Sequence, residues 1–532
     1  MPVVPVNKSF SVPRGHGEGL IDPPLDQARS LIESNRSLRD QYDYDVQGQP
    51  LGQLIQNAQK ELLREAQRHT TVYRDVDRSI GHDQPIILAG HQPQLFHAGV
   101  WFKNFALSSI AKHLKANAVN LLVDNDILRN PSIRVPAGSS SSRHIDTVMF
   151  DRSIEAIPYE ERAVLDEELF TSFGDRVDGA AAGLVAHPLI GQLWPAAIEA
   201  FQEHNNAGYA IARARHRLEG HWGQNTLELP VSKVSQTDSF YGFTAHLLAH
   251  LPRFQEIHNS SLAEYRRVNR IRSHSHPVPD LAMDGQWFEA PFWVWSNESP
   301  HREHLFVRSA GDGLELTDRR QIRVSLELSA DADADRAVEQ LSSYAAKGIK
   351  IRPRALITTM YSRLVLSDLF LHGIGGAKYD QLTDAIIHRF FGVRPPEFMT
   401  LSATALLFED EVQGLRNDLR RTKRLLREYR FHPEGHVTQS PEVDRLVAEK
   451  SEWIQTQLPK GQRAERHRNI ERVNFALQDR LSVESAKLSE KLDRLAMELR
   501  RELPFASREF SFCLFSEETL RPLLLDLSRA AP

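Results

Sequence analysis

The stretch from residue 85 to residue 126 constrains the fold most, because two short apolar runs flank one amphipathic helix pattern. IILAG is typical of a short buried strand, HQPQLF of a turn-rich loop, VWFKNFALSSIAKHL of a helix and AVNLLV of a second strand. Two strands connected through a helix lie parallel in one sheet. The sequence therefore predicts an α/β protein with a Rossmann-like parallel sheet core.

A chain of 532 residues is too long for one ordinary domain, and its pattern divides it into several parts. We expect an N-terminal arm over residues 1–84, with the periodic stretch Leu51–Arg68 as its helix. The Rossmann-like nucleotide-binding core is expected over residues 85–407, with a helical insertion at about 150–285. Further strands are predicted at EAPFWVWS, EHLFVRS, IRVSLEL and RALITT. Residues 504–532 are expected to return to the core.

Residues 408–503 are enriched in Leu, Arg, Glu, Lys and Gln. In two stretches, apolar positions alternate in steps of three and four, as in a heptad seam. These positions are Val412, Leu415, Leu419, Thr422, Leu426 and Tyr429, and then Leu488, Leu492, Leu495 and Leu499. The pattern predicts an antiparallel coiled-coil arm, out along about 408–430 and back along about 463–503. We expect a homodimer through this arm, with packing inside one chain as the alternative.

Composition narrows the classes of function. Lys and Arg number 65 against 70 Asp and Glu, a balance that predicts no nucleic-acid-binding surface. No apolar run approaches the ~18 residues of a membrane span. The single cysteine, Cys513, excludes intrachain disulfides, and the N-terminus lacks the pattern of a secretory signal, so we expect a cytoplasmic protein with a small-molecule substrate. His274, His276 and Asp280 fit a surface loop, and no metal-ligand set is predicted.

The loop between the first strand and the helix carries the first candidate site. Open parallel sheets bind ligands at the carboxyl ends of their strands, where free N–H groups at a helix start attract phosphates. The loop has the hydrogen-bonding side chains of His91, Gln92 and His97, followed by the charge of Lys103. We assign Gly90, His91, Gln92, Gly99 and Lys103 to cofactor binding and His97 to catalysis. A polar loop that caps the helix is the alternative.

Two more segments supply candidate residues. Asp124 and Asp126 close the second strand, where carboxylates can hold a ribose, an amine or a magnesium-bound phosphate. An Asx turn is the alternative. The glycine-rich segment 373–379 permits close backbone approach, with Gly375 and Gly376 assigned to cofactor binding and Lys378 to catalysis; a tight turn is the alternative. We expect His91, His97 and Asp124 to face one cleft.

These blocks, in this order, resemble the bacillithiol biosynthesis cysteine-adding enzymes, and H-A-G-V at His97 resembles the H-x-G-H signature of class I nucleotidyltransferases. GHQPQLF is similar to the family's G-Q-Q-x-x-L-F, with His91 replacing the first Gln. Asp124 and Asp126 match the outer aspartates of E-D-H-D, with Val123 and Asn125 as departures. Gly375 and Gly376 match the G-G of G-G-P-G-E, whereas Ala377 and Lys378 depart from the rest of that motif.

The resemblance implies a nucleotidyltransferase-like Rossmann core, a coiled coil that pairs two subunits, and ATP or another adenine nucleotide as cofactor. It also implies a carbon–nitrogen ligase that joins cysteine, or a similar amino acid, to an amino-sugar acceptor. In that reaction Asp124 and Asp126 would orient the acceptor amine or a magnesium ion, and Lys378 or Arg354 would stabilise the activated carboxylate. The alternatives are a nucleotidyltransferase acting on a small acceptor and a non-catalytic dimeric nucleotide-binding or scaffold protein.

Overall fold

The computed structural model describes residues 10–76, 81, 83–140, 142–153, 156–456 and 463–529. The contacts within the chain divide it into two compact units. Unit 1 comprises Met1–Ala405 and Arg508–Pro532, and unit 2 comprises Leu406–Ser507. Within the described ranges, no helix is both long enough and apolar enough to cross a bilayer.

Unit 1 is built on a six-stranded sheet. Its strands, in spatial order, are β1 (Gly19–Asp22), β16 (Phe398–Ala403), β15 (Leu369–His372), β4 (Ile86–His91), β5 (Asn117–Leu122) and β8 (Leu227–Pro230). All neighbours pair in parallel except β1, which runs antiparallel to β16. Most residues of β4 and all of β5 are buried, as expected for parallel strands covered on both faces. The predicted parallel strand–helix–strand unit is confirmed.

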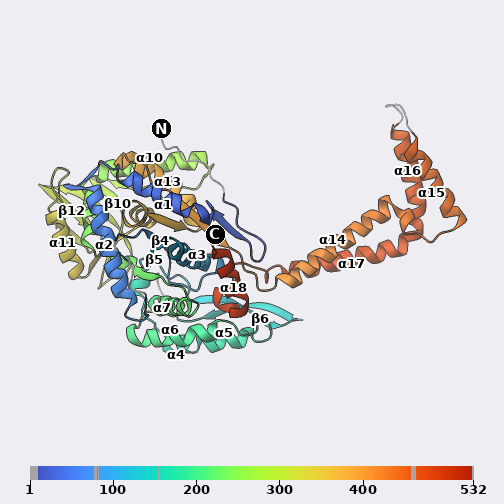
Figure 1. The fold of residues 1–532 in the computed structure, drawn as a ribbon, viewed down its shortest axis with the longest axis horizontal. Helices are drawn as coiled ribbons and strands as arrows, with labels where there is room; N and C mark the ends of the chain where they lie inside the picture. Colours follow the sequence, from blue (N-terminus) through green and yellow to red (C-terminus); the bar gives the residue numbers. More distant parts are fainter. Residues whose placement is uncertain are drawn as a thin grey trace. The chain divides into compact units, whose positions relative to one another are not determined.

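The helix of that unit is α3 (Ala98–Leu114), which lies beside β4 and β5 (Figure 1). Helix α3 has apolar side chains on most of its faces, which is typical of a buried helix. Its residues Trp101, Phe102 and Phe105 are fully buried. After β5 the chain continues to β8, whereas β15, on the other side of β4, leads through α13 (Ile374–Phe391) to β16. The strand order therefore reverses between β4 and β15.

A second sheet in unit 1 is antiparallel. Its order is β13 (Arg323–Leu326), β12 (Gly313–Thr317), β11 (Glu303–Ala310), β10 (Trp287–Ser296) and β14 (Ile349–Pro353), with β9 (Met283–Asp284) beside β10. Three of the predicted strands lie here, as β10, β11 and β13, and not in the parallel sheet. The predicted strand RALITT is wrong: it forms α12 (Ala355–Tyr361), in which Leu356, Ile357 and Met360 bury one helical face. Both sheets share one hydrophobic core.

The N-terminal residues differ from the expected arm, because they belong to unit 1. They form α1 (Ala28–Arg39), β2 (Asp45–Val46), β3 (Gln49–Pro50) and α2 (Leu51–Thr70), in addition to β1. The predicted helix Leu51–Arg68 is confirmed as α2, and its apolar face enters the core. Arg39 of α1 forms a buried ion pair with Asp368 at 2.8 Å. These contacts make the segment a structural part of the sheet domain.

The predicted helical insertion holds most of the remaining helices of unit 1. These are α4 (Glu167–Thr171), α5 (Phe173–Ala181), α6 (Ile190–His204), α7 (Ala207–His221), α8 (Val231–Val234), α9 (Asp238–Ala249) and α10 (Leu251–Val268). Helices α5, α6 and α7 pack in sequence (Figure 1). The region also contains β8 of the main sheet, so it is more than an insertion. Outside it lie the hairpin β6 (Ser132–Ser139) and β7 (Ser142–Met149), and helix α11 (Asp335–Ala346).

Unit 2 is helical and consists of α14 (Glu409–Phe431), α15 (Pro441–Gln455), α16 (Arg463–Gln478) and α17 (Ser482–Glu502). Helix α14 packs against α17, and α15 packs against α16 (Figure 1). The expected single return path is therefore two helices, broken by a 3-10 turn at Asp479–Leu481. The last part of the chain joins unit 1, where α18 (Glu517–Ser528) packs against α3 and the ring of Phe512 lies 4.2 Å from that of Trp101.

Candidate functional site

A cavity of about 550 Å³ lies where the strand order of the main sheet reverses, at the ends of β4 and β15. It is lined by the loop after β4, the first turns of α3 and the first turn of α13. The structure brings all seven predicted cofactor-binding residues and the predicted catalytic His97 to this cavity. They are Gly90, His91, Gln92, His97, Gly99, Lys103, Gly375 and Gly376.

The two helices present their N-termini to the cavity in different ways. The side chain of His97 caps α3, because its Nδ1 accepts a hydrogen bond from the backbone N–H of Gly99 at 3.1 Å. Helix α13 begins after Gly373 without a side-chain cap. The predicted glycine turn is thus the first turn of a helix, where N–H groups have no partner within the helix. A Cβ on Gly375 would meet nothing within 4 Å, so a ligand has room to approach this backbone.

Lys103 places a buried positive charge in the cavity wall. Its side chain is buried, with the residue 5% exposed, and Nζ donates a hydrogen bond to Gly90 O at 2.8 Å. Over the described residues it forms no ion pair with a carboxylate. Burial lowers the pKa of Lys103 to about 8, so the group is still mainly charged at neutral pH. The cavity therefore has an uncompensated positive charge in its wall.

The histidines around this lysine are held neutral. Burial is the main cause that lowers the pKa of His91 well below its ordinary value, and Lys103 lowers it further. Burial also lowers the pKa of His97. Arg508 lines the cavity too and forms an ion pair with Glu509 at 3.6 Å. Neutral imidazoles, a buried lysine and free backbone N–H groups together favour an anionic ligand.

One cluster in the same wall was not predicted from the sequence. His372, the last residue of β15, lines the cavity, and its Nε2 is hydrogen-bonded to Oδ2 of Asp380 in α13. The same carboxylate oxygen accepts a hydrogen bond from Arg363 at 2.9 Å. The available signal was a histidine at the end of a strand followed, eight residues later, by an aspartate two helical turns along. A catalytic interpretation of that spacing needs the strand and helix ends that the structure supplies.

A second, mostly apolar cavity of about 250 Å³ adjoins the first. The two share Gln92, Val123, Ala355 and Thr358 as lining residues. Asp126 lies in the second cavity, where it accepts hydrogen bonds from Gln92 at 2.9 Å and from Arg302 at 3.2 Å. The guanidinium groups of Arg302 and Arg354 lie 4.6 and 4.8 Å from the ring centre of Trp293. The shared residues make the two cavities neighbouring compartments.

Two predicted catalytic residues lie elsewhere. Asp124 does not line either cavity: it is buried, and Oδ1 accepts a hydrogen bond from the backbone N–H of Ser232 at 2.9 Å. Burial, with a smaller contribution from Glu160, raises the pKa of Asp124 to about 7. The expected common cleft of His91, His97 and Asp124 therefore holds only for the two histidines. Lys378 is exposed on α13 and is absent from the lining of both cavities.

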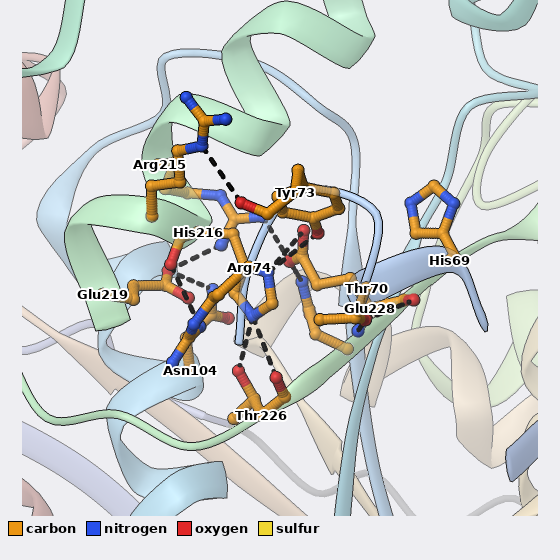
Figure 2. Close-up of polar contacts among 12 residues, drawn as sticks. His69, Thr70, Tyr73, Arg74, Asn104, Arg215, His216, Glu219, Thr226 and Glu228 are labelled. Atoms are coloured by element: carbon orange, nitrogen blue, oxygen red, sulfur yellow. Dashed lines mark hydrogen bonds and ion pairs between the residues drawn. The ribbon is translucent and has the colours of Figure 1, made fainter. Parts of the chain in front are cut away.

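A separate buried polar network, which is hydrogen-bonded to α3 through Glu219, is shown in Figure 2. His216, Glu219 and Glu228 place potential ligand atoms within 4.8 Å of one another, as a metal site would. Arg215, however, forms ion pairs with both carboxylates, at 2.6 Å to Glu219. Both ring nitrogens of His216 are also hydrogen-bonded, Nδ1 to Tyr73 and Nε2 to Thr226. A guanidinium between the carboxylates fits a structural ion-pair network better than a metal centre.

This network also positions the cavity wall. Oε1 of Glu219 accepts hydrogen bonds from Trp101 at 2.6 Å and from Asn104 at 2.8 Å, both in α3. These residues flank Lys103 in the sequence. The network therefore fixes the rotation of the helix that presents the lysine to the cavity.

No protein-family model matches this chain, and no curated protein matches it significantly.

Proposed function

We propose that unit 1 binds ATP or another adenine nucleotide in the large cavity, with the phosphates at Lys103 and the first turn of α13. The observation that carries the proposal is the buried, unpaired charge of Lys103. Burying a lone ion costs several kcal/mol unless an opposite charge compensates it. A phosphate supplies that charge, and backbone N–H groups at the start of α13 supply hydrogen bonds for its remaining oxygens.

The topology supports a nucleotide over other anions. When β4, β5, β8, β15 and β16 are numbered one to five in chain order, their spatial order is 3-2-1-4-5. This is the strand order of doubly wound Rossmann folds, whose ligands bind where the order reverses. A Rossmann-like core is therefore part of the proposal.

The reaction that we propose is carbon–nitrogen ligation, in which cysteine or a similar amino acid is joined to an amino-sugar acceptor. The second cavity adjoins the phosphate site through Gln92 and Thr358 and has the room and polar groups for a small substrate. Asp126 would orient the amine, and Arg354 would stabilise charge on the activated carboxylate. Among the described lining residues of the large cavity Glu509 is the single carboxylate, so magnesium would be held chiefly by the phosphates.

Nucleotidyl transfer without ligation is the second candidate function. His97 lies at the start of α3 and lines the cavity in which the phosphates would bind. In that reaction the imidazole would lie beside the leaving phosphate. A small acceptor would again use the second cavity.

Calorimetric titration of the full chain with ATP and magnesium tests the proposal. We expect Lys103→Met to weaken ATP binding about 10–100-fold, the value of one charge-assisted hydrogen bond. Lys112→Met, at an exposed position of the same helix, is the matched control and should bind as the wild type does. Absence of ATP, ADP and AMP binding by the wild type would refute the nucleotide site.

Product analysis separates the functions. Phosphate or pyrophosphate release that requires both cysteine and glucosamine supports ligation, whereas release that requires an acceptor alone supports nucleotidyl transfer. Nucleotide binding without any release in a screen of amino acids and amino sugars identifies a non-catalytic nucleotide-binding protein.

We also propose that unit 2 forms a homodimer. Of the predicted seam only Val412, Thr422 and Leu495 are buried, and the other positions are half-buried, although α14 and α17 pack together. A second copy would cover these half-buried positions. Light scattering should give twice the 60.5 kDa chain mass, and Leu488→Glu with Leu492→Glu should reduce it to one chain. A wild-type mass near 60 kDa, unchanged by the substitutions, excludes the dimer.

A further inference from the structure

The ring of His372 is held in one orientation at the edge of the large cavity. Its centre lies 4.5 Å from that of Phe370 and 5.1 Å from that of Phe398, with the rings edge to face. Asp380 bonds its Nε2, and Arg363 bonds the same carboxylate oxygen. The imidazole is therefore fixed by contacts from β15, β16 and α13.

These contacts determine which ring nitrogen holds the proton. Although burial opposes them, the interactions with His372, coulombic and through the hydrogen bond, and the guanidinium charge of Arg363 hold the pKa of Asp380 below its ordinary value. An ionised carboxylate only accepts hydrogen bonds, so Nε2 must be the protonated nitrogen. The lone pair of the neutral ring is then on Nδ1.

Nδ1 has no hydrogen-bond partner over the described residues. The space beside it is free of a side chain because residue 376 is glycine. A Cβ on Gly376 would lie 2.5 Å from Nδ1, so a side chain there would displace the ring. His372, Gly376 and Lys103 line the same cavity. An unprotonated nitrogen thus lies at the proposed phosphate site, beside the first turn of α13.

We propose that His372 is the general base of this site and that Asp380 is the residue that positions it. This inference rests on the proposed ligase function. In the step, the acceptor extends from the second cavity across the boundary at Gln92 and Thr358, and its amine nitrogen forms a bond to the acyl carbon of the activated amino acid. The carbon–oxygen bond to the phosphate group breaks, the electron pair leaves with the phosphate, and the amine proton moves to Nδ1 of His372.

The charges around the ring suit this role. Burial lowers the pKa of His372, and Arg363 and Lys103 lower it further, whereas Asp380 raises it. Phe370 of β15 itself and Phe398 of β16 contact the ring edge to face, and His91 at the end of β4, which lines the same cavity, is neutral. The ring is therefore neutral at physiological pH and available to accept a proton, and protonation of the ring should slow the transfer in acidic solution.

Carbethoxylation with diethyl pyrocarbonate, mapped by mass spectrometry on the full-length protein, tests the geometry without any substrate. The reagent attacks unprotonated, accessible imidazole nitrogens. We expect modification of His372, its suppression by saturating ATP, and slower modification in Asp380→Asn, because the amide no longer fixes the tautomer. An unmodified His372, or modification that Asp380→Asn leaves unchanged, overturns the assignment.

Chemical rescue tests the role in catalysis. Amide formation from ATP, cysteine and glucosamine should fall about 10²–10⁴-fold in His372→Ala, the usual contribution of a general base. Added imidazole should restore part of this rate, and substituted imidazoles should rank by basicity. Asp380→Glu should retain more activity than Asp380→Asn, because a carboxylate still bonds Nε2. Retention of the wild-type rate by His372→Ala, or loss without rescue in a variant that still binds ATP, overturns the proposal.

The two proposals fail separately. If the wild type binds no nucleotide, the proposed function fails, whereas the carbethoxylation pattern still reports on His372 and Asp380. If the wild type makes the amide and His372→Ala does so at the same rate, the ligase stands and the general base is wrong. Thermal unfolding of each variant identifies any that does not fold, and His372→Gln, which retains a donor for Asp380, then replaces His372→Ala.

Discussion

Unit 1 contains two buried clusters that combine histidine with charged residues, and they differ in whether their charges are matched. Around Arg215, the guanidinium pairs with Glu219 and Glu228, and Arg74 adds a second positive charge that interacts with both carboxylates. His216 is hydrogen-bonded through both ring nitrogens. Around the large cavity, Lys103 lacks a carboxylate partner and His372 has a lone pair without a donor among the described residues. We call the first cluster complete because each of its charged side chains has an opposite charge beside it, although Oε2 of Glu228 accepts no hydrogen bond. The second cluster lacks an anion beside Lys103.

This difference separates structural from functional polar groups. A complete network adds specificity to packing and tolerates no additional ion, whereas an incomplete one places an energetic cost on the protein until a ligand binds. The two clusters are connected, since Trp101 and Asn104 anchor α3 to Glu219 while Lys103 of the same helix faces the cavity. The complete cluster thus holds the incomplete one in place.

The largest predicted effect comes from breaking the complete cluster. Arg215→Met leaves Glu219 and Glu228 buried without their common counter-ion, and we expect it to lower the free energy of unfolding by about 3–5 kcal/mol. Denaturant unfolding followed by tryptophan fluorescence measures this, since Trp101 and Trp222 lie nearby with ring centres 5.0 Å apart.

The control for this variant is Arg217→Met in the same helix. Arg217 pairs with Glu199, whose side chain is 60% exposed, so its loss should cost at most about 1 kcal/mol. Equal destabilisation by the two substitutions would contradict the distinction between the clusters.

Removing the charge from the incomplete cluster should instead raise the free energy of unfolding. Lys103→Met removes a buried charge that the ligand-free protein does not compensate, so we expect it to stabilise the folded protein by about 1–3 kcal/mol while it weakens ATP binding. Thermal unfolding with and without ATP measures both effects. A destabilised Lys103→Met would mean that the lysine is already compensated.

The stability difference between Lys103→Met and the wild type should depend on pH, because burial lowers the pKa of Lys103 from 10.5 to about 8. Between these two values the unfolded chain binds more protons than the folded one, so the stability of the wild type rises with pH. The penalty of the charged lysine is fully present below pH 8 and is relieved as the pH approaches 10.5. The advantage of Lys103→Met should therefore shrink between pH 7 and pH 10 in thermal unfolding, and a constant advantage would contradict it.

The sequence predicted the parts of this site that depend on local pattern. The apolar runs of β4 and β5 and the periodicity of α3 are local, and they lead directly to a parallel unit with a loop at its end. His91, Gln92, His97 and Lys103 were found because they belong to that loop and helix. Topology then brought Gly375 and Gly376 to the same cavity from a distant segment.

The features that the sequence did not predict depend on partners far along the chain. Asp124 has the same strand-end position as the other candidates, but Ser232 holds its side chain away from both cavities. The segment RALITT has a high strand propensity, but it forms α12 because a helix buries one apolar face of this segment against the core. The role of His372 requires the neighbouring position of β15 and β4, which no local pattern specifies.

The smallest predicted effect compares the two glycines at the start of α13. Both are in the first turn, where replacing glycine by alanine ordinarily stabilises a helix by about 0.5–1 kcal/mol. A Cβ on Gly375 meets nothing, so Gly375→Ala should show that gain in denaturant unfolding. A Cβ on Gly376 lies 2.5 Å from Nδ1 of a ring that Asp380 holds in place, so Gly376→Ala should instead lose about 1–3 kcal/mol.

The double variant Gly376→Ala with His372→Ala distinguishes the cause of this loss. If the clash with the imidazole is responsible, shortening His372 removes it, and the second alanine then costs nothing beyond His372→Ala alone. If Gly376→Ala is as costly without the imidazole, the backbone of α13 and not the ring sets the requirement for glycine. The first outcome would establish that position 376 lacks a side chain because the imidazole of His372 occupies that space.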